Sequence, residues 1–409
     1  MLDFNVFSSE AFDIIQDTAY YNAIYEDIGV QLDAQLFAIN GPFMLDSQFD
    51  ASKRPDRRVR KRKHKSWRNA KNVGEINRIE KLSKDIRTEG LRIAFFSAQS
   101  IKDNNHKARE RAREVCDRSI KMYRPAPIAS NEIITLSDNS AKTIIYQMVA
   151  SHCYLLCICS PFILEEEFCM LNSWYKNDSD HCIHLHVSER RSDTTTTHYV
   201  PPGATFHIGS VSDVRNFAAI NGLLFDLVVI DPPWNNLCVK RQQSYVTCES
   251  PLDSVDLNCL APTGLVAIWI TNKKGIEGEL DAFFRQWKLT RLATFIWLKV
   301  TLEGDPVCSF NGGHKLPYER LVFASHAESS SLYSDISSSD GKVFASVPMA
   351  VPSRKPPVVP IVKQYGIVPK QPLELFARSL LPYTVSVGYE ALLLQSSLCL
   401  ISLNKDNEG

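Results

Sequence analysis

The residues with the clearest chemical potential lie at 228–236, where the sequence reads VVIDPPWNN. An apolar, β-branched run is followed there by Asp231, Pro232, Pro233 and Trp234. Proline cannot donate a hydrogen bond to a sheet ladder, so two consecutive prolines end a strand. We therefore expect a carboxylate and an aromatic ring at the carboxyl edge of a sheet, where α/β proteins bind their ligands.

This tetrapeptide is suited to holding a planar amine. Asp231 and the Pro232 carbonyl would each accept one N–H, while Trp234 stacks against the plane. Two acceptors favour a more tetrahedral nitrogen whose lone pair points at an electrophile, and such positioning lowers a reaction barrier. The alternative is a tight proline turn that only ends a strand.

The tetrapeptide resembles the signature of the MT-A70 family of adenine-N6 methyltransferases. The resemblance covers about residues 200–398 and is most similar to the branch called methyltransferase-like protein four. It implies an enzyme that uses S-adenosylmethionine to methylate the N6 amino group of adenine in a polynucleotide. The motifs that follow in the family's order are VKRQQSY (239–245), WITNKKG (269–275), FIWLKV (295–300), HKLPYE (314–319), VPSRKPP (351–357) and ELFARSLLP (374–382).

The resemblance also implies an α/β fold, namely a Rossmann-like methyltransferase sheet with circularly permuted motif order and an α/β N-terminal region. The cofactor motif follows the catalytic one, so LELFAR would be the strand beside the methionine and ribose of S-adenosylmethionine. Phe376 and Arg378 match family cofactor contacts, and Asp231 lies favourably beside a sulfonium. Lys355 matches the lysine that meets the cofactor's carboxylate; without the resemblance it would be a surface lysine before a helix.

Two departures from the family pattern lie on the cofactor side. The family usually has an Asp where the cofactor's adenine binds, and this sequence has Ser210 followed by Val211. Near the end, the family's Asn is replaced in Tyr389-Glu390, in which Glu390 can still accept from ribose hydroxyls. These changes keep a second hypothesis open, a catalytically silent nucleic-acid-binding subunit of a methyltransferase complex. A methyltransferase for free nucleotides or a protein amide is disfavoured, since the motif begins with Asp rather than Asn.

Two loops of the family pattern are implied to surround the target nucleotide. Cations there can contact phosphates, and an aromatic ring can pack on a base. Solvated loop charges are the alternative. The candidate residues are Lys240, Arg241 and Tyr245 in the first loop, and His314 and Lys315 in the second.

A basic arm, defined as residues 54–71, contains ten Lys or Arg and one Asp, whereas the whole chain has a net charge of zero. This asymmetry is common in proteins that meet nucleic acid. The arm could be a nuclear localisation signal, a nucleic-acid-binding segment or a solvated disordered run, and the first two can coexist. Its candidate contacts are Arg57, Arg58, Arg60, Lys61, Arg62 and Lys63.

The composition, 44% hydrophobic and 22% charged, is typical of a soluble globular protein. We expect no transmembrane helix and no secretory signal. Eleven cysteines scattered through apolar runs favour a reducing compartment. No metal is expected, because Cys153, Cys157 and Cys159 with His152 lack the paired spacing of common zinc sites. We expect a nuclear location (cytosol or mitochondrion as alternatives), RNA or DNA as partner, and either a monomer or a protein partner.

The elements that must position these residues are predicted by the apolar runs FDLVVI, GLVAIWIT, LATFIWLKV and RLVFAS. Each has strand length, and helix-like or turn-rich segments separate them, which predicts a largely parallel sheet covered on both faces. A helix is predicted over 276–288, with Leu280, Phe283, Phe284 and Trp287 on one face. Trp269 and Trp297 are expected in the sheet core.

We expect three parts along the chain. They are an N-terminal segment (1–73) with the basic arm, partly disordered; an α/β region (74–200); and the methyltransferase catalytic domain (201–409). Finer expectations are helical spacing over 11–28, charged helices over 74–125, strand-rich core over 143–170, a linker or exposed loop over 188–203, and a mobile Ser-rich insertion over 325–342.

Overall fold

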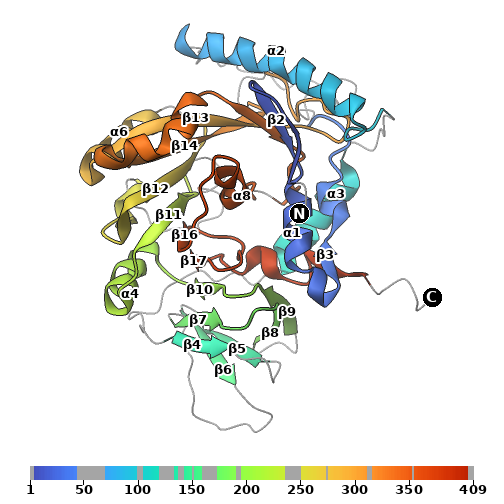
Figure 1. Ribbon diagram of the computed structural model, residues 1–409. Helices are drawn as coiled ribbons and strands as arrows, with labels where there is room; N and C mark the ends of the chain where they lie inside the picture. The colour runs from blue at the N-terminus through green and yellow to red at the C-terminus, as the bar shows by residue number, and fades with distance from the viewer. Residues whose placement is uncertain are drawn as a thin grey trace, which may run out of the picture.

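The computed structural model describes residues 4–43, 70–98, 105–118, 133–136, 142–149, 152–158, 173–189, 195–234, 250–272, 275–310, 316–351 and 354–403. One large mixed sheet runs through these residues (Figure 1). Its strands in spatial order are β1 (Asn5–Ser8), β2 (Phe12–Ile15), β15 (Val343–Ser346), β13 (Leu289–Lys299), β14 (Tyr318–His326), β12 (Leu260–Ile270), β11 (Phe225–Ile230), β16 (Pro372–Leu375), β17 (Val385–Val387), β10 (Thr205–His207), β7 (Trp174–Asn177) and β4 (Ile133–Leu136).

In the middle of this sheet the strands are parallel, and their spatial order differs from their order in the sequence. Strands β12, β11, β16, β17 and β10 are parallel neighbours, and β14 lies antiparallel between β12 and β13. β16 and β17 come late in the chain yet lie between β11 and β10. The predicted Rossmann-like methyltransferase sheet with circularly permuted order is confirmed.

β11 illustrates why both faces of the sheet are covered. Val228 and Ile230 pack into one apolar cluster with residues of α6, and Leu227 and Val229 pack into another with residues of α8. Alternate side chains of a strand point to opposite faces, so a continuously apolar strand needs a layer on each. The described helices are α1 (Asp17–Ile24), α2 (Ala70–Arg92), α3 (His106–Arg118), α4 (Val214–Asn221), α6 (Ile276–Trp287), α7 (Ser334–Ser338) and α8 (Val358–Lys363).

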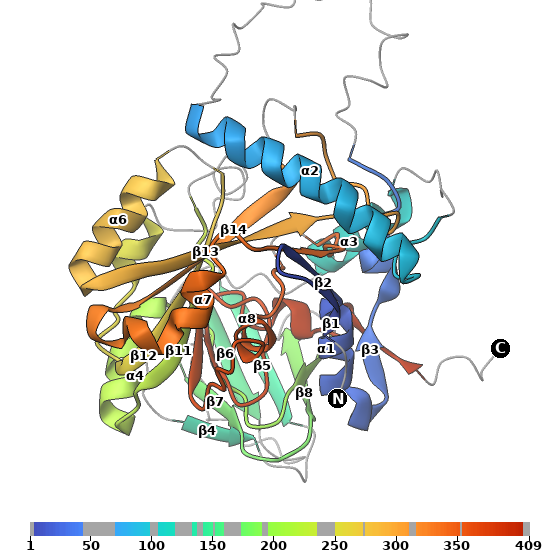
Figure 2. The same ribbon diagram turned by 45° about the horizontal axis from the view of Figure 1, so that its top comes forward.

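Figure 1 shows α4 and α6 on one side of the sheet and α8 on the other. α2 runs across one end of the sheet (Figure 2), with Ile76, Ile79 and Ile86 in the cluster formed with residues of β2, β13 and β15. The strands predicted after residue 200, the helix over 276–288 and the charged helices after residue 74 are therefore confirmed. None of the described helices combines the length and apolar composition needed to cross a membrane.

Two further sheets are described. β18 (Leu400–Ser402) pairs with β3 (Val30–Leu32). The other has the strand order β6 (His152–Ile158), β5 (Lys142–Val149), β8 (Ile183–Glu189) and β9 (Thr195–Val200). The described residues 188–189 and 195–200, part of the segment expected to be a linker or exposed loop, belong instead to β8 and β9, which pair antiparallel with Ser188 opposite Thr195. The β-branched threonines that begin β9 favour an extended, paired backbone.

The Ser-rich segment over 325–342 is also not the mobile insertion that was expected. It forms a 3₁₀ helix (Ala327–Tyr333) followed by α7. Ile336 is fully buried in the cluster beneath β13 and β14. The Ser329 hydroxyl donates to the Pro262 carbonyl at 2.7 Å. Burial of the Tyr333 and Ile336 side chains orders this segment even though the surrounding residues are mostly serines.

The large sheet crosses both boundaries predicted from the sequence, at residues 73 and 200. β2 pairs in parallel with β15, and β7 pairs with β10. Part of the segment expected to be helical, residues 12–15, is β2, and α1 begins only at Asp17. Most of the basic arm lies outside the described residues.

Candidate active site

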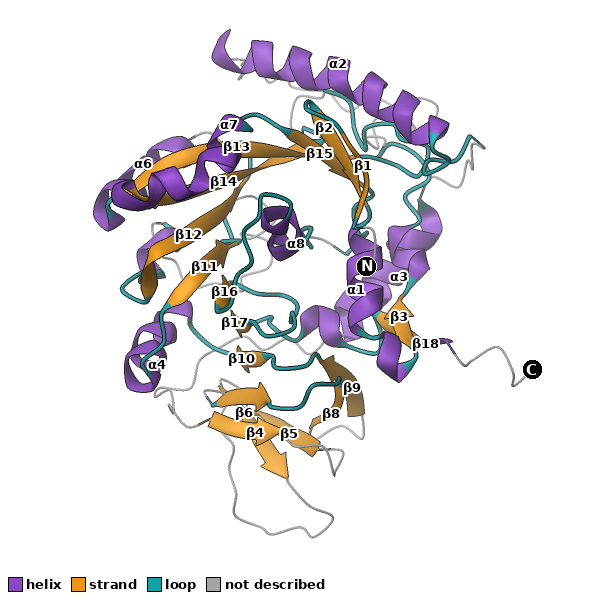
Figure 3. Cartoon of the chain, viewed as in Figure 1, coloured by secondary structure: helices purple, strands orange, loops and turns teal. Residues whose placement is uncertain are grey.

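Most of the predicted cofactor and catalytic residues lie at the carboxyl ends of four adjacent parallel strands. Asp231 follows β11, Phe376 follows β16, and Tyr389 lies just beyond β17. Ser210 lies just beyond β10. These strands are neighbours in the order β11, β16, β17, β10 (Figure 3). Segments far apart in the sequence thus meet along one edge of the sheet, the usual ligand edge of such folds.

The backbone around Asp231 follows from its two prolines. The Asp231 N–H donates to the Leu375 carbonyl at 3.3 Å, which continues the pairing of β11 with β16 by one residue. Pro232 and Pro233 cannot extend this ladder. The Trp234 N–H then donates to the Pro232 carbonyl at 2.7 Å, closing a tight turn. A carbonyl oxygen has two lone pairs, so the Pro232 carbonyl can accept a second hydrogen bond.

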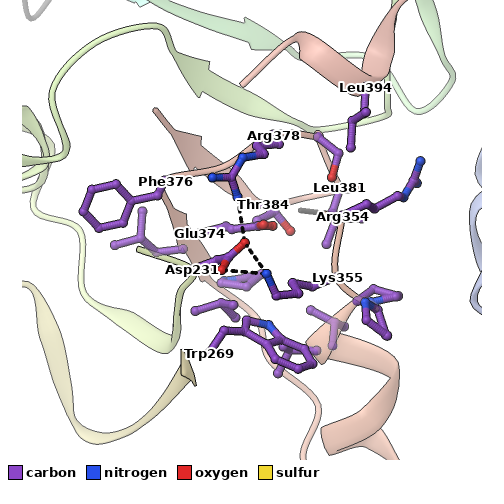
Figure 4. Close-up of a pocket in the computed structure, with 18 of the residues that line it drawn as sticks. Asp231, Trp269, Arg354, Lys355, Glu374, Phe376, Arg378, Leu381, Thr384 and Leu394 are labelled. Carbon is purple, nitrogen blue, oxygen red and sulfur yellow. Dashed lines mark hydrogen bonds and ion pairs between the residues drawn. The ribbon is translucent and has the colours of Figure 1, made fainter. Parts of the chain in front are cut away.

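Two cations hold the Asp231 carboxylate (Figure 4). The Lys355 Nζ donates to Oδ1 at 3.0 Å and to Oδ2 at 3.2 Å. The Arg378 guanidinium donates to Oδ2 at 2.8 Å. All three side chains are largely buried, and the two cations balance the cost of placing a carboxylate away from water.

Each cation also contacts a second carboxylate. Lys355 lies 3.4 Å from the Glu319 carboxylate, which is also paired with Lys299. The Arg378 Nε donates to Glu390 at 3.1 Å. Burial alone would raise the pKa of Glu319, but the ammonium groups of Lys299 and Lys355 lower it to about 2. Burial opposes the charge of Lys355, yet the carboxylates of Asp231 and Glu319 raise its pKa above the usual lysine value.

Glu374 adds a different kind of acid to the same cavity, which is also lined by Asp231, Lys355 and Arg378. Burial, reinforced by the negative charge of Asp231, raises the pKa of Glu374 to about 7. Such a carboxyl exchanges a proton near neutral pH, which is uncommon outside functional sites. Glu374 and Glu319 both stand inside motifs read from the sequence, ELFAR and HKLPYE, but no role was inferred for them there.

The Trp234 ring is buried in the core, whereas the sequence predicted that it would stack against the target amine. Its ring is 2% exposed and belongs to the apolar cluster that includes residues of β11, β12 and α6. Its indole N–H donates to the Trp269 carbonyl at 2.9 Å. In this structure the ring therefore ties the turn after β11 to β12. Trp269 and Trp297 are buried in edge-to-face contact, which confirms their place in the core, and Trp269 also lines the cavity.

The remaining cofactor candidates lie on the β17 and β10 side. The Ser210 hydroxyl accepts from the Ser212 N–H at 3.3 Å and begins a short 3₁₀ turn that contains Val211. Glu390 is bound to Arg378. Gly388, beside Tyr389, lies so near the loop after β16 that a Cβ there would sit 2.9 Å from the Ala377 nitrogen. Only glycine permits this approach of the two loops.

The predicted nucleic-acid contacts cannot be compared with the structure. Lys240, Arg241, Tyr245, His314, Lys315 and the six arm residues from Arg57 to Lys63 all lie outside the described residues. They stay predictions. Among the residues that the structure describes, no group of three or more His, Cys, Asp or Glu is arranged to hold a metal ion.

Similarity to known proteins assigns the family. The MT-A70 family model matches residues 225–390. A DNA N6-methyl methyltransferase of Caenorhabditis elegans is 37% identical over 387 residues, which is 94% of this chain and 96% of that protein. The chain belongs to the MT-A70 family.

Other relatives of the MT-A70 family match a shorter part of the chain. An N6-methyladenosine RNA methyltransferase MTA1 of Cryphonectria parasitica is 34% identical over 48% of this chain and 60% of its own length. The human N(6)-adenine-specific methyltransferase METTL4 is 32% identical over 48% of this chain and 43% of its own length. The MT-A70 match begins with β11 and ends at Glu390, so it contains Asp231, Lys355 and Arg378.

The charged and polar groups along this edge fit S-adenosylmethionine, the cofactor implied by the family resemblance. Lys355 and Arg378 supply cations for a carboxylate, and the Asp231 carboxylate supplies a negative charge that attracts an ammonium or a sulfonium. Glu390 supplies acceptors for ribose hydroxyls. The close contact between Gly388 and Ala377 holds the loop after β17 against the loop after β16.

Proposed function

We propose that this protein is an S-adenosylmethionine-dependent methyltransferase that modifies the N6 amino group of adenine in a polynucleotide. The observation that carries the proposal is Asp231, held at the carboxyl end of β11 by Lys355 and Arg378 beside the loops that follow β16 and β17. The names of the relatives support adenine as the target base and include both DNA and RNA as carriers.

S-adenosylmethionine, when bound, supplies an electrophilic methyl group on a cationic sulfonium. We assign Lys355 to its carboxylate, Glu390 to its ribose, and the Ser210–Val211 turn to its adenine. These residues come from separate loops, two of them directly after β10 and β17 and one before α8, so no single segment of the chain forms the site.

Asp231 is assigned to the target amine. Lys355 and Arg378 occupy much of the accepting capacity of its carboxylate, so gripping an amine requires at least one cation to withdraw. The second carboxylates, Glu319 and Glu390, make this exchange possible, because each cation keeps a partner when it leaves Asp231. The Pro232 carbonyl offers its second lone pair to the other N–H of the amine.

The decisive experiment is methylation with labelled cofactor on RNA and DNA of matched sequence, followed by nucleoside mass spectrometry. N6-methyladenine in either polymer supports the proposal, and the better substrate identifies the natural carrier. If S-adenosylhomocysteine does not bind and neither polymer is labelled, while the protein still binds nucleic acid, the protein is instead a silent subunit.

We further propose that the basic arm binds the phosphates of this polynucleotide and directs the protein to the nucleus. Replacing Arg57, Arg58, Arg60, Lys61, Arg62 and Lys63 by Gln should weaken binding and flatten its dependence on salt, because fewer counterions are released. Fluorescence anisotropy at several salt concentrations measures both effects. Unchanged affinity and slope would leave localisation as the arm's role, which microscopy of the same variant tests.

A further inference from the structure

Lys355 is preceded by a second buried cation that the proposed chemistry does not use. Residues 354–357 lie outside helices and strands, between β15 and α8. Figure 4 shows the two side chains diverging, Lys355 toward Asp231 and Arg354 away from it. Pro356 and Pro357 follow and restrict the backbone. The position of the Arg354 side chain therefore constrains that of Lys355.

Arg354 is held by a residue from the other end of the chain. Its guanidinium carbon lies 3.7 Å from the centre of the Tyr21 ring, on α1. Arg354 is 7% exposed, and its Nε has no hydrogen-bond partner. No ion pair of Arg354 with a carboxylate occurs among the described residues. A cation on an aromatic face is strongly favoured where water is excluded, so the Tyr21 ring helps to fix Arg354. The Arg354 Nη1 also contacts the Met349 sulfur at 3.7 Å.

Tyr21 is itself rigidly placed. It is 3% exposed, in a cluster with Val30 and Leu400 of the two-stranded sheet. Directly after α1, the Tyr25 hydroxyl accepts from the Gln395 amide at 2.6 Å. α1 is thus anchored to the C-terminal segment, and Tyr21 lines the same cavity as Asp231, Lys355 and Glu374. This helix lies outside residues 225–390, the range of the family match.

We infer that Tyr21 is a positioning residue of the active site, which acts through Arg354 to hold Lys355 against Asp231 and in place for an acidic group of the cofactor. The N-terminal helix α1 then helps to position an active-site side chain, in addition to packing beside the site. The inference rests on the proposed function, because Lys355 is assigned there to the cofactor's carboxylate.

The test is calorimetric titration of the full chain with S-adenosylhomocysteine, which carries the same amino-acid group. Tyr21→Leu removes the aromatic face and should weaken binding roughly tenfold or more, as expected for the loss of a buried cation–π contact. Tyr21→Phe keeps the face and should bind within about twofold of the wild type. The KM for the methyl donor should rise in the Leu variant with little change in kcat.

Tyr25→Leu is the matched control, because it truncates a buried tyrosine directly after α1 whose hydroxyl is bound to Gln395. It should lower the melting temperature as Tyr21→Leu does, yet leave the affinity of the folded protein unchanged. Equal affinity in Tyr21→Leu and wild type, or equal loss in both Leu variants, would overturn the inference. Failure of the wild type to bind S-adenosylhomocysteine would overturn the proposed function instead.

Discussion

At the scale of single residues, the site is a chain of alternating charges around Asp231. Lys355 and Arg378 each bridge Asp231 to a second carboxylate, so Asp231 and both cations each have two ion-pair partners. Removing one member of a buried pair is most costly when the other is left alone. Here the remaining partners limit that cost, which lets single substitutions test chemistry separately from folding.

Asp231→Ala should abolish methyl transfer while the protein stays folded. The variant loses the acceptor for the amine, whereas Lys355 keeps Glu319 and Arg378 keeps Glu390. We expect a loss of about 1–3 kcal/mol in the free energy of unfolding, the usual scale for a lost charged hydrogen bond. Circular dichroism melts and the methylation assay measure the two effects. Near-normal turnover would contradict the role of Asp231.

Glu374 should give the protein a pH-dependent stability near neutrality. Its pKa is about 7 in the folded protein and near 4.5 in the unfolded chain. Between these values the folded state keeps a proton that the unfolded state releases, so stability falls as the pH rises through this window. Glu374→Gln removes that loss, and its melting temperature should drop less than the wild type's between pH 5 and pH 8.

The exposed Glu328 provides the control for this experiment. Glu328→Gln should melt with the same pH dependence as the wild type, because Glu328 is exposed and does not line the cavity that contains Glu374. If Glu374→Gln and wild type show parallel curves over the whole range, Glu374 does not retain its proton in the folded protein.

At the scale of elements, the burial of a few side chains determines whether a segment is ordered, and the average polarity of the segment matters less. The Ser-rich stretch before β15 has the composition of a loop, yet Tyr333 and Ile336 insert under the sheet. The Tyr333 hydroxyl also donates to the Thr263 carbonyl. Two side chains at helical spacing are enough to order a segment when the sheet provides a site for them.

Ile336→Ala should therefore behave as a core substitution. We expect a cost of about 2–5 kcal/mol in the free energy of unfolding, from the lost apolar transfer and the cavity left behind. Chemical denaturation measures it. Ser337→Ala, in the same turn, is the control and should be nearly neutral; an equally small effect of Ile336→Ala would show that α7 is not anchored.

At the scale of the whole molecule, the sheet is one structure that three stretches of sequence share. β2 comes from the N-terminal segment and covers the β15 edge, while β7 comes from the middle region and covers β10. Arg111 of α3 joins further parts, donating to Asp33 at 2.7 Å and to the Leu398 carbonyl at 2.8 Å. The catalytic edge is thus supported by residues far outside the family match.

A chain shortened to residues 201–409 should fail to fold cooperatively. Removing β2 and β7 uncovers two strand edges, and removing α1 and α2 exposes apolar clusters, which promotes aggregation. Size-exclusion chromatography and thermal melts compare it with the full chain. A soluble fragment that melts cooperatively and binds S-adenosylhomocysteine as the full chain does would contradict this view.

The sequence alone determined the local features of the site. Proline chemistry ended β11 at Asp231, continuous apolar runs identified the buried strands, and helical periodicity identified α6. The MT-A70 resemblance supplied Lys355, Phe376 and Arg378. Each of these rests on near neighbours in the chain or on a contiguous motif, which is why it could be read without a structure.

The tertiary structure alone decided which groups meet. Strand order and packing bring Lys355 and Arg378 to Asp231. They also bury the Trp234 ring and place Tyr21 against Arg354. Charge and aromatic contacts fall off within a few ångströms, so they depend on distances that no spacing along the chain encodes. The same holds for the Ser-rich segment, whose order depends on a sheet built from other parts of the chain.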